Sequence, residues 1–225
     1  MKKVRIFIFL LLLIFSFTAC KKTEKNTIAT DADANFSALA QEKAEEYADN
    51  QNPVAIIVTD HNECIVFELY RNVAPQTVKN FISLANDGFY DGLLFHRVKP
   101  NFVIQGGDPL GNGSGGPGYE IFGEFTNNGF SNTLSHKRSV VSMARKGSLT
   151  DPASAYNTAG SQFFICVADV SASLDGDYAA FGMVLEGMDA VDRIVSVDRN
   201  PQNDKPLEDQ VMEYVRVFEN GEIVS

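Results

Sequence analysis

The sequence has only three cysteines in 225 residues, too few for a fold held together by a framework of disulfide bonds. Cys20 lies at the end of an N-terminal apolar run, which leaves Cys64 and Cys166 for the rest of the chain. Cys166 follows the strand-like run QFFI, where a buried small hydrophobic residue is the favoured role. We therefore predict that Cys64 and Cys166 are unpaired.

Basic residues are also few. The chain has 19 Lys and Arg against 29 Asp and Glu, which gives a net charge of −10. Three of the basic residues and none of the acidic ones lie within residues 1–19, so removal of that segment would leave a net charge of −13. A protein with this excess of negative charge repels phosphate backbones. Nucleic acid is therefore not expected as a partner.

Histidine is scarce as well, and no motif for a metal or a phosphate group is present. His96, Asp108 and His136 could suggest a metal or acid–base site, but their spacing is not the compact spacing of metal ligands. The glycine-rich run over 111–118 is not followed by the Lys-Ser/Thr pair of a phosphate-binding loop. No serine lies in a nucleophile-elbow motif. We expect neither a metal nor a cofactor.

The longest apolar run lies at the N-terminus and is too short to span a membrane comfortably. Three basic residues within the first five positions precede an apolar stretch over 6–15, and small residues follow as far as Cys20. This is the order of a secretory signal, with an uncleaved anchor as the alternative. The sequence FTAC resembles a bacterial lipobox, in which the cysteine becomes the lipidated first residue, although Phe17 stands where Leu is usual. We predict a signal peptide over 1–19 and lipidation of Cys20.

The segment between this signal and the folded domain reads as a tether. Residues 21–35 contain almost nothing to bury, and residues 36–49 are rich in helix formers. We therefore assign residues 20–50 to a lipidated, flexible or helical tether and residues 51–225 to the folded domain. The cysteine is followed by two lysines and no acidic cluster, which favours an exported protein held by its lipid to a bacterial membrane and facing the periplasm.

The pattern of the domain predicts an all-β fold with two helices. Two β-branched and aromatic runs around a polar turn indicate a hairpin, and two amphipathic segments with apolar residues three and four apart indicate helices. Many short strands with few helices suggest a closed antiparallel sheet whose open ends are capped. The predicted elements are a hairpin over 54–59 and 64–70, helices over 75–88 and about 188–195, and a last strand over 211–218.

Four residues stand out before any family is considered. Gln105 lies in an apolar strand-like run, where its amide needs a hydrogen-bond partner. By position alone, Phe102 and Phe164 would be core residues and Arg97 a solvated surface charge.

Three motifs change that interpretation. They are FHRVKPNFVIQGGD over 95–108, SMAR over 142–145, and GSQFFI over 160–165, the last followed by LD at 174–175 and FG at 181–182. Together they resemble the signature of the cyclophilins, a family of peptidyl-prolyl cis–trans isomerases. The resemblance runs from about residue 54 to 218 and implies a closed, eight-stranded antiparallel β-barrel with two capping α-helices.

The resemblance also implies an apolar pocket on the outside of the barrel that receives a proline ring. Arg97 would lie over the bond that rotates, and glutamine side chains would hydrogen-bond the peptide. The resemblance implies that the catalytic residues are Arg97, Phe102, Gln105 and Phe164. The implied substrate-binding residues are His96, Val103, Ala144, Arg145, Gln162, Leu174 and Tyr178.

The function expected from the resemblance is isomerisation of Xaa-Pro bonds in exported proteins, which assists their folding. The alternative is a proline-peptide-binding chaperone or assembly partner whose catalytic rate has no cellular role. The expected partners are proline-containing polypeptides, and a monomer is expected. The segment 145–159 is longer than in compact cyclophilins and lies beside the pocket, and its effect on substrate choice is left open.

Overall fold

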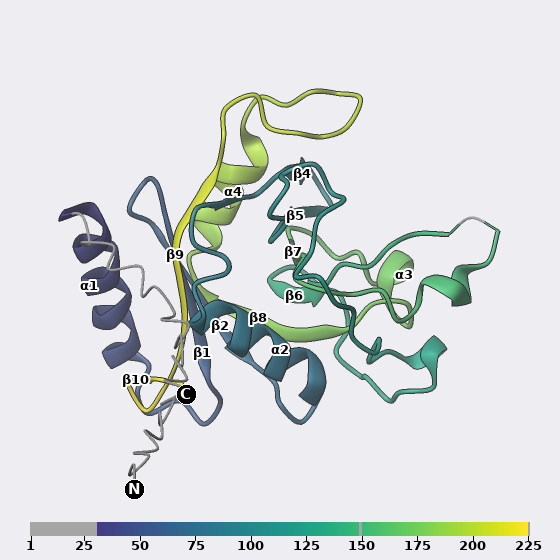
Figure 1. Cartoon of the computed structure of the whole chain (residues 1–225), viewed down its shortest axis with the longest axis horizontal. Helices are drawn as coiled ribbons and strands as arrows, with labels where there is room; N and C mark the ends of the chain where they lie inside the picture. The colour runs from purple at the N-terminus through teal and green to yellow at the C-terminus, as the bar shows by residue number, and fades with distance from the viewer. Residues whose placement is uncertain (1–30, 149, 225) are drawn as a thin grey trace, which may run out of the picture.

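The computed structural model describes residues 31–148 and 150–224, and one antiparallel sheet dominates it (Figure 1). The strands are β1 (Val54–Thr59), β2 (Cys64–Leu69), β3 (Leu93–Leu94), β4 (Arg97–Lys99), β5 (Val103–Gly106), β6 (Val140–Met143), β7 (Phe163–Cys166), β8 (Ala180–Glu186), β9 (Val211–Glu219) and β10 (Glu222–Ile223). The helices are α1 (Asp31–Glu46), α2 (Pro75–Asn86), α3 (Ser171–Leu174) and α4 (Met188–Ser196), with 3-10 turns at Thr126–Asn128 and Pro152–Ala155. The predicted hairpin, both predicted helices and the last strand are confirmed.

The sheet is curled, and it differs from the expected closed ring of eight strands. Its order is β10-β9-β1-β2-β8-β6-β7-β5-β4, with β3 also paired to β9, and no strand pairing in the described part of the chain joins β4 back to β9. Residues 198–210 pass beside β4 as a loop, in which the carbonyl of Asp204 accepts a hydrogen bond from the N–H of Val98 (2.8 Å). Asp204 has a φ of 58°, which an extended strand cannot adopt, so the loop bridges this gap without forming a ladder.

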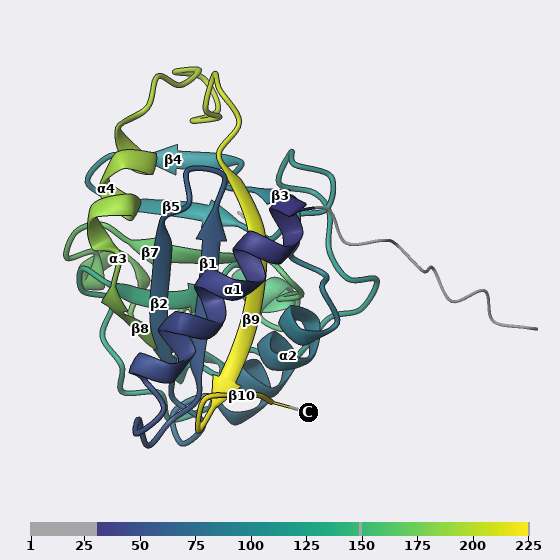
Figure 2. The ribbon, with the colours of Figure 1, turned by 90° about the vertical axis from the view of Figure 1, so that its left-hand side faces the viewer.

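The two halves of the sheet cross each other and enclose the main core. In Figure 2, β1, β2 and β9 run along the vertical direction, whereas β4, β5 and β7 run across it. Phe81 of α2 lies among the rings of Phe67, Phe163 and Phe181, with centroid distances of 5.4–5.5 Å. These contacts join α2 to strands from both halves of the sheet.

The outer faces of both halves are apolar as well. Along β5 and β7, Ile104 and Ile165 point into the core, whereas Val103, Phe164 and Cys166 belong to a separate apolar cluster on the outer face. A further outer cluster covers β1 and β2. Each half is therefore buried on two sides, and something other than the core must cover each outer face.

Helix α1 covers the outer face of β1. Ala40 and Ala44 are buried there, and Lys43 forms an ion pair of 2.7 Å with Glu186 of β8. Figures 1 and 2 show α1 crossing β9 and β1 on the side away from the loops around β6 and β7. Part of the predicted tether is thus a docked helix. The predicted signal peptide and Cys20 lie outside the described residues.

The N-terminus of α2 is held by a distant carboxylate. Glu124 is 2% exposed and accepts hydrogen bonds from the backbone N–H of Gln76 (3.0 Å) and Thr77 (2.8 Å) and from the Thr77 hydroxyl (2.7 Å). The first N–H groups of a helix have no partner within the helix, and the helix dipole favours a negative charge there. Glu124 therefore fixes the loop that carries it against α2.

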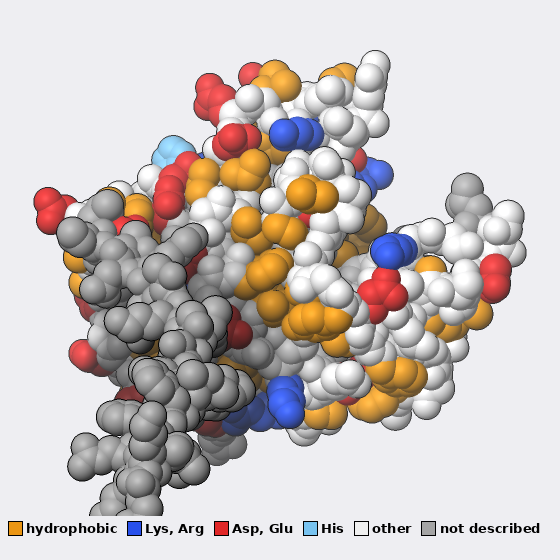
Figure 3. Space-filling model, in the orientation of Figure 1, with side chains coloured by type: hydrophobic (Ala, Val, Ile, Leu, Met, Phe, Trp, Pro, Cys, Tyr) orange, Lys and Arg blue, Asp and Glu red, His pale blue; other side chains and the backbone are white. Residues whose placement is uncertain are grey.

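The two cysteines of the domain are free thiols in different outer clusters. Burial raises the pKa of Cys64 to about 11 and that of Cys166 to about 12. In residues 31–148 and 150–224, none of the helices has both the length and the hydropathy required to cross a membrane. On the face seen in Figure 3, Lys and Arg side chains are isolated and form no continuous basic patch, in keeping with the acidic composition.

Candidate active site

Two adjacent cavities lie on the outer face of β5, β6 and β7. The smaller has a volume of about 200 Å³, and the larger has a volume of about 730 Å³. Nine of the eleven residues that the sequence predicted for the site line the smaller cavity. They are Arg97, Phe102, Val103, Gln105, Ala144, Arg145, Phe164, Leu174 and Tyr178.

Strand register brings the central members together. Gln105 of β5 pairs with Arg97 of β4 on one side and with Phe164 of β7 on the other, so the three side chains share one face. Regular strand alternation would place Phe102 on the same side as the core residue Ile104, but Phe102 does not follow this alternation. It lies in the turn before β5, after Asn101 with a φ of 59°, and packs with Val103 on the outer cluster.

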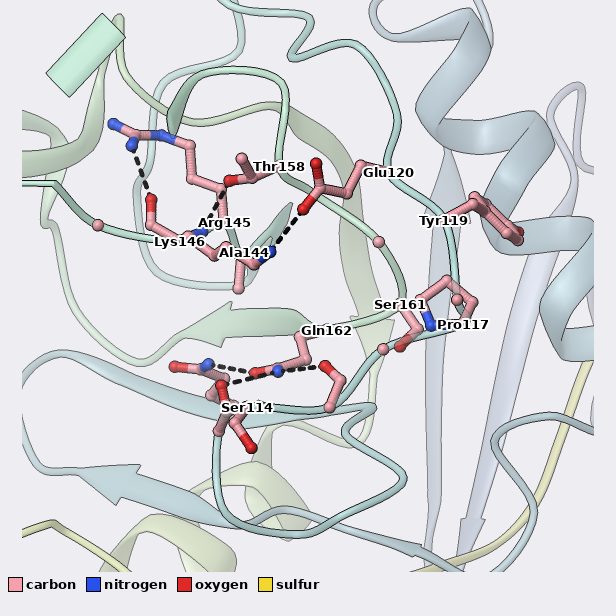
Figure 4. A pocket seen from close by; sticks show the side chains of 17 residues that line it. Ser114, Pro117, Tyr119, Glu120, Ala144, Arg145, Lys146, Thr158, Ser161 and Gln162 are labelled. Carbon is pink, nitrogen blue, oxygen red and sulfur yellow. Dashed lines mark hydrogen bonds and ion pairs between the residues drawn. The ribbon is translucent and has the colours of Figure 1, made fainter. Parts of the chain in front are cut away.

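A chain of side-chain amides runs between the two cavities. Arg97 Nη1 donates to Gln105 Oε1 (3.3 Å), and Gln105 Nε2 donates to Gln162 Oε1 (3.0 Å). Gln162 lines the larger cavity and donates through Nε2 to the carbonyls of Gly113 (3.1 Å) and Gly115 (2.9 Å), as Figure 4 shows. These bonds satisfy the amide of Gln105 and fix its orientation, with its oxygen towards Arg97.

The Arg97 guanidinium is held at the edge of the smaller cavity. Its Nη2 lies 3.6 Å from Asp204 Oδ2, and its Cζ lies 5.9 Å from the centroid of the Phe102 ring. The side chain retains 31% exposure, so part of the guanidinium faces open space. Asp204 was not among the predicted residues, because it lies more than a hundred positions away in a loop without any recognisable motif.

A buried histidine supports the ring of Phe164 from behind. His136 stacks on Phe164 with a centroid distance of 6.0 Å; its Nδ1 lies 2.8 Å from Asp175 Oδ1 and its Nε2 lies 2.9 Å from Ser142 Oγ. Burial lowers the pKa of His136, although Asp175 opposes that shift. Ser142 is fully buried, so no substrate reaches it, and this Asp-His-Ser arrangement is a support for the pocket and not a nucleophile.

His96 is not part of either cavity lining. It was predicted to bind substrate, but the residue is only 5% exposed, because it precedes Arg97 in an extended segment and its side chain points to the opposite side. Burial lowers the pKa of His96, and the nearby negative charge of Asp108 opposes that shift. Asp108 accepts hydrogen bonds from the backbone N–H of Leu110, Asn112 and Gly113, which shapes the glycine-rich loop.

The larger cavity lies between the glycine-rich loop and the two ends of the 145–159 segment. Lys146 Nζ lies 2.6 Å from Glu120 Oε1, and Figure 4 shows this ion pair on the cavity wall. On the side of α2, Tyr119 donates to Asn80 Oδ1 (2.7 Å), and Asn80 donates to the carbonyl of Gly160 (2.8 Å). Across the described ranges, no group of three or more His, Cys, Asp or Glu lies close enough to hold a metal ion.

The site combines apolar walls, the hydrogen-bonded amides of Gln105 and Gln162, and the positive charge of Arg97. It can hold a small apolar ring against Phe102 and Phe164, donate hydrogen bonds to carbonyl groups of an extended chain, and direct positive charge at a point above the ring. The residues that line the smaller cavity include no serine, threonine, cysteine, lysine, histidine or carboxylate side chain.

Comparison with known proteins identifies close relatives. A family model described as cyclophilin type peptidyl-prolyl cis-trans isomerase/CLD matches residues 54–217. The chain is 44% identical over 136 residues to a peptidyl-prolyl cis-trans isomerase of Helicobacter pylori, covering 60% of this chain and 76% of that protein. It is 47% identical over 133 residues to peptidyl-prolyl cis-trans isomerase B of Bacillus subtilis, covering 59% and 83%.

Solved structures give the same result. A crystal structure of a cyclophilin type peptidyl-prolyl cis-trans isomerase from Cryptosporidium parvum superposes with a TM-score of 0.64 at 30% identity, covering 75% of this chain and 98% of that one. A second crystal structure of that protein, in the presence of the dipeptide Ala-Pro, gives a TM-score of 0.63 at 29% identity, covering 76% and 99%. The family match begins at residue 54, so α1 lies outside it.

Proposed function

The chain belongs to the cyclophilin-type peptidyl-prolyl cis–trans isomerases, and from that premise we propose that the smaller cavity is the catalytic site for Xaa-Pro bonds. The observation that carries the proposal is the placement of Arg97 beside an apolar cavity lined by Phe102 and Phe164. The relative from Cryptosporidium parvum that was crystallised in the presence of Ala-Pro supports a proline-containing ligand.

The rotation barrier of the peptide bond determines how much acceleration the site must provide. Resonance gives the C–N bond partial double-bond character and a rotation barrier of ~18–20 kcal/mol. An Xaa-Pro bond therefore isomerises unaided in roughly tens to hundreds of seconds. To reach milliseconds requires an acceleration of about 10⁴–10⁵-fold, or roughly 5.5–7 kcal/mol off the barrier.

The residues of the cavity can supply this without a covalent step or a proton transfer. In the twisted transition state the imide nitrogen becomes pyramidal and regains its lone pair. The Arg97 guanidinium stabilises that lone pair more than it stabilises the planar amide, and this difference is what catalysis requires. Gln105 holds Arg97 through its oxygen, and Asp204 stabilises the guanidinium from the other side.

The apolar walls hold the part of the substrate that does not rotate. Phe102, Val103, Phe164 and Leu174 receive the proline ring, and His136 keeps Phe164 in place. The flanking polypeptide extends along the glycine-rich loop into the larger cavity, where Gln162 marks the boundary between the two cavities. With the ring fixed, rotation takes place in the chain that precedes it.

We further propose that the substrates are exported proteins. The support is the signal-like order of residues 1–19 and the lipobox-like sequence that ends at Cys20. A lipid on that cysteine holds the enzyme, as a monomer, at a bacterial membrane facing the periplasm. Helix α1 docks on the side away from the cavities, so an N-terminal anchor leaves the catalytic site open to substrate.

The experiment that tests the catalytic site compares three arginine variants in a proline-isomerisation assay with an Xaa-Pro peptide. Arg97→Ala should lower kcat/KM by about 10²–10³-fold, the usual cost of one preorganised donor at a transition state. Arg97→Lys should recover only part of the rate, because an ammonium lacks the planar set of donors. Arg71→Ala is the matched control, since Arg71 forms a surface pair with Glu219 (2.6 Å) away from the cavities.

One result would contradict the proposal, namely an Arg97→Ala protein that is folded and as active as the wild type. Far-UV circular dichroism and urea titration show whether the variant is folded, so that a lost rate can be assigned to the missing guanidinium. If the peptide affinity of Arg97→Ala is kept and the protein still performs its cellular role, the molecule acts as a proline-peptide-binding module instead.

A further inference from the structure

Arg145 was expected to contact substrate, yet its guanidinium is occupied by the protein itself. Its side chain is 9% exposed. Its Nε donates to the carbonyl of Asp177 (2.9 Å), its Nη1 donates to the carbonyl of Lys146 (3.1 Å), and its Nη2 lies 4.0 Å from Asp177 Oδ1. Two of its five N–H groups therefore donate to backbone carbonyls of the protein, and its third nitrogen faces the Asp177 carboxylate.

Three aromatic rings surround the same guanidinium. The Cζ atom lies 4.8 Å from the ring centroid of Tyr178, 5.2 Å from that of Tyr156 and 5.6 Å from that of Phe125. All three distances lie within the range of cation–π attraction, which is stronger for a partly desolvated cation. A planar guanidinium can also stack on rings, whereas an ammonium cannot.

The three rings come from separate parts of the chain. Tyr178 is a wall of the smaller cavity and contacts Phe164 edge-to-face at 5.7 Å. Tyr156 belongs to the 145–159 segment, whose ends line the larger cavity, and lies edge-to-face on Phe125 at 5.2 Å. Phe125 follows the helix-capping Glu124. The cation thus joins the proline cavity to the wall of its neighbour.

We propose that Arg145 is a positioning residue, which holds the 145–159 segment against the proline cavity so that one polypeptide substrate is bound by both cavities together. The proposal rests on the proposed catalytic site. It separates two properties: rotation of the Xaa-Pro bond depends on the smaller cavity, and affinity for a long polypeptide depends on the Arg145 cluster of Tyr178, Tyr156 and Phe125. A short peptide that fills only the smaller cavity does not use the second wall.

The test uses Tyr156, because it contacts Arg145 but lines neither cavity. The full-length protein in detergent micelles is assayed on a tetrapeptide with a central Xaa-Pro bond and on an unfolded polypeptide whose refolding is limited by proline isomerisation. Tyr156→Leu should raise KM for the polypeptide about tenfold with little change in kcat. Its kcat/KM for the tetrapeptide should stay within about twofold of the wild type.

Tyr156→Phe is the conservative partner, since it keeps the ring, and it should behave as the wild type on both substrates. Arg145→Lys should raise KM for the polypeptide by at least as much as Tyr156→Leu. The double variant Arg145→Lys, Tyr156→Leu should have the same KM for the polypeptide as Arg145→Lys alone, because both substitutions remove the same interaction. In hydrogen exchange, Tyr156→Leu should speed the amides of Lys146 and Gly123, which bond Thr158 and Asn157, and leave the amides of β5 and β7 unchanged.

Three results would overturn the proposal. The first is an equal loss of kcat/KM by Tyr156→Leu on both substrates, and the second is no loss of kcat/KM on either. The third is a Tyr156→Phe protein that does not retain the wild-type KM. These outcomes are independent of Arg97. A normal isomerisation rate in Arg97→Ala would refute the catalytic site. If Tyr156→Leu changes the kinetics on the polypeptide and on the tetrapeptide by the same factor, only the positioning role is refuted.

Discussion

Glu124→Gln should destabilise the protein strongly although it changes only one functional group. The buried carboxylate accepts three hydrogen bonds, from Gln76 N–H, Thr77 N–H and the Thr77 hydroxyl, at 2.7–3.0 Å. Glutamine has one acceptor oxygen, so its NH₂ group would face at least one of these donors. The substitution also removes the negative charge from the N-terminus of α2.

The magnitude follows from these contacts. A hydrogen bond to a charged group contributes about 1.5–3 kcal/mol, and a buried donor left without a partner costs about 1–3 kcal/mol. Some of this is recovered by the oxygen that glutamine retains, so we expect a loss of about 2–4 kcal/mol in the free energy of unfolding. With a urea m-value of about 2–3 kcal/mol/M, the midpoint should fall by roughly 1–2 M.

Urea titration followed by far-UV circular dichroism measures this loss directly. Glu120→Gln is the matched control, because Glu120 forms an exposed pair with Lys146, and such pairs contribute about 0–1 kcal/mol. An unchanged m-value in both variants shows that the midpoints can be compared. If Glu124→Gln shifts the midpoint no more than Glu120→Gln does, the carboxylate is not the anchor of α2 and the reasoning is wrong.

Two further predictions concern pH and the N-terminus. The pKa values of His96 and His136 are lowered by burial, so the unfolded chain takes up these protons first as the pH falls below about 6.5. The free energy of unfolding should therefore be highest above that pH and decrease below it by at most about 1.4 kcal/mol per pH unit for each histidine. A urea midpoint that is constant from about pH 7 to pH 5 would contradict this prediction. Cys20→Ser should abolish incorporation of radiolabelled fatty acid and leave an unprocessed precursor, and equal labelling of both proteins would exclude lipidation at Cys20.

Much of the fold follows from local sequence patterns. The hairpin of β1 and β2 is visible because β-branched runs flank a polar turn, and α2 is visible because Pro75 and Gly88 bracket an apolar stripe. The gap beside β4 is spanned by a loop in which Asp204 has a φ of 58°. No pattern of hydrophobic residues reports that angle.

The candidate site divides in the same way. Arg97, Gln105 and Phe164 could be grouped because long motifs carry them, and register then brings them to one face. The placement of Phe102 depends on a turn at Asn101, and the cage around Arg145 needs rings from three distant segments. Contacts between such segments are decided by packing, which a single sequence does not display.

The pairing of β1 with β9 has a consequence for how the chain folds. Val54 pairs with Phe218 and Val58 with Tyr214, so one of the two neighbours of β1 lies more than 150 residues later in the chain. To close a loop of this length costs about 4–5 kcal/mol of chain entropy before any contact compensates for it. Until β9 leaves the ribosome, β1 retains an open edge, and α1 has no completed surface to cover. Folding of the domain is therefore postponed until β9 has been synthesised, and the sheet stays incomplete until then.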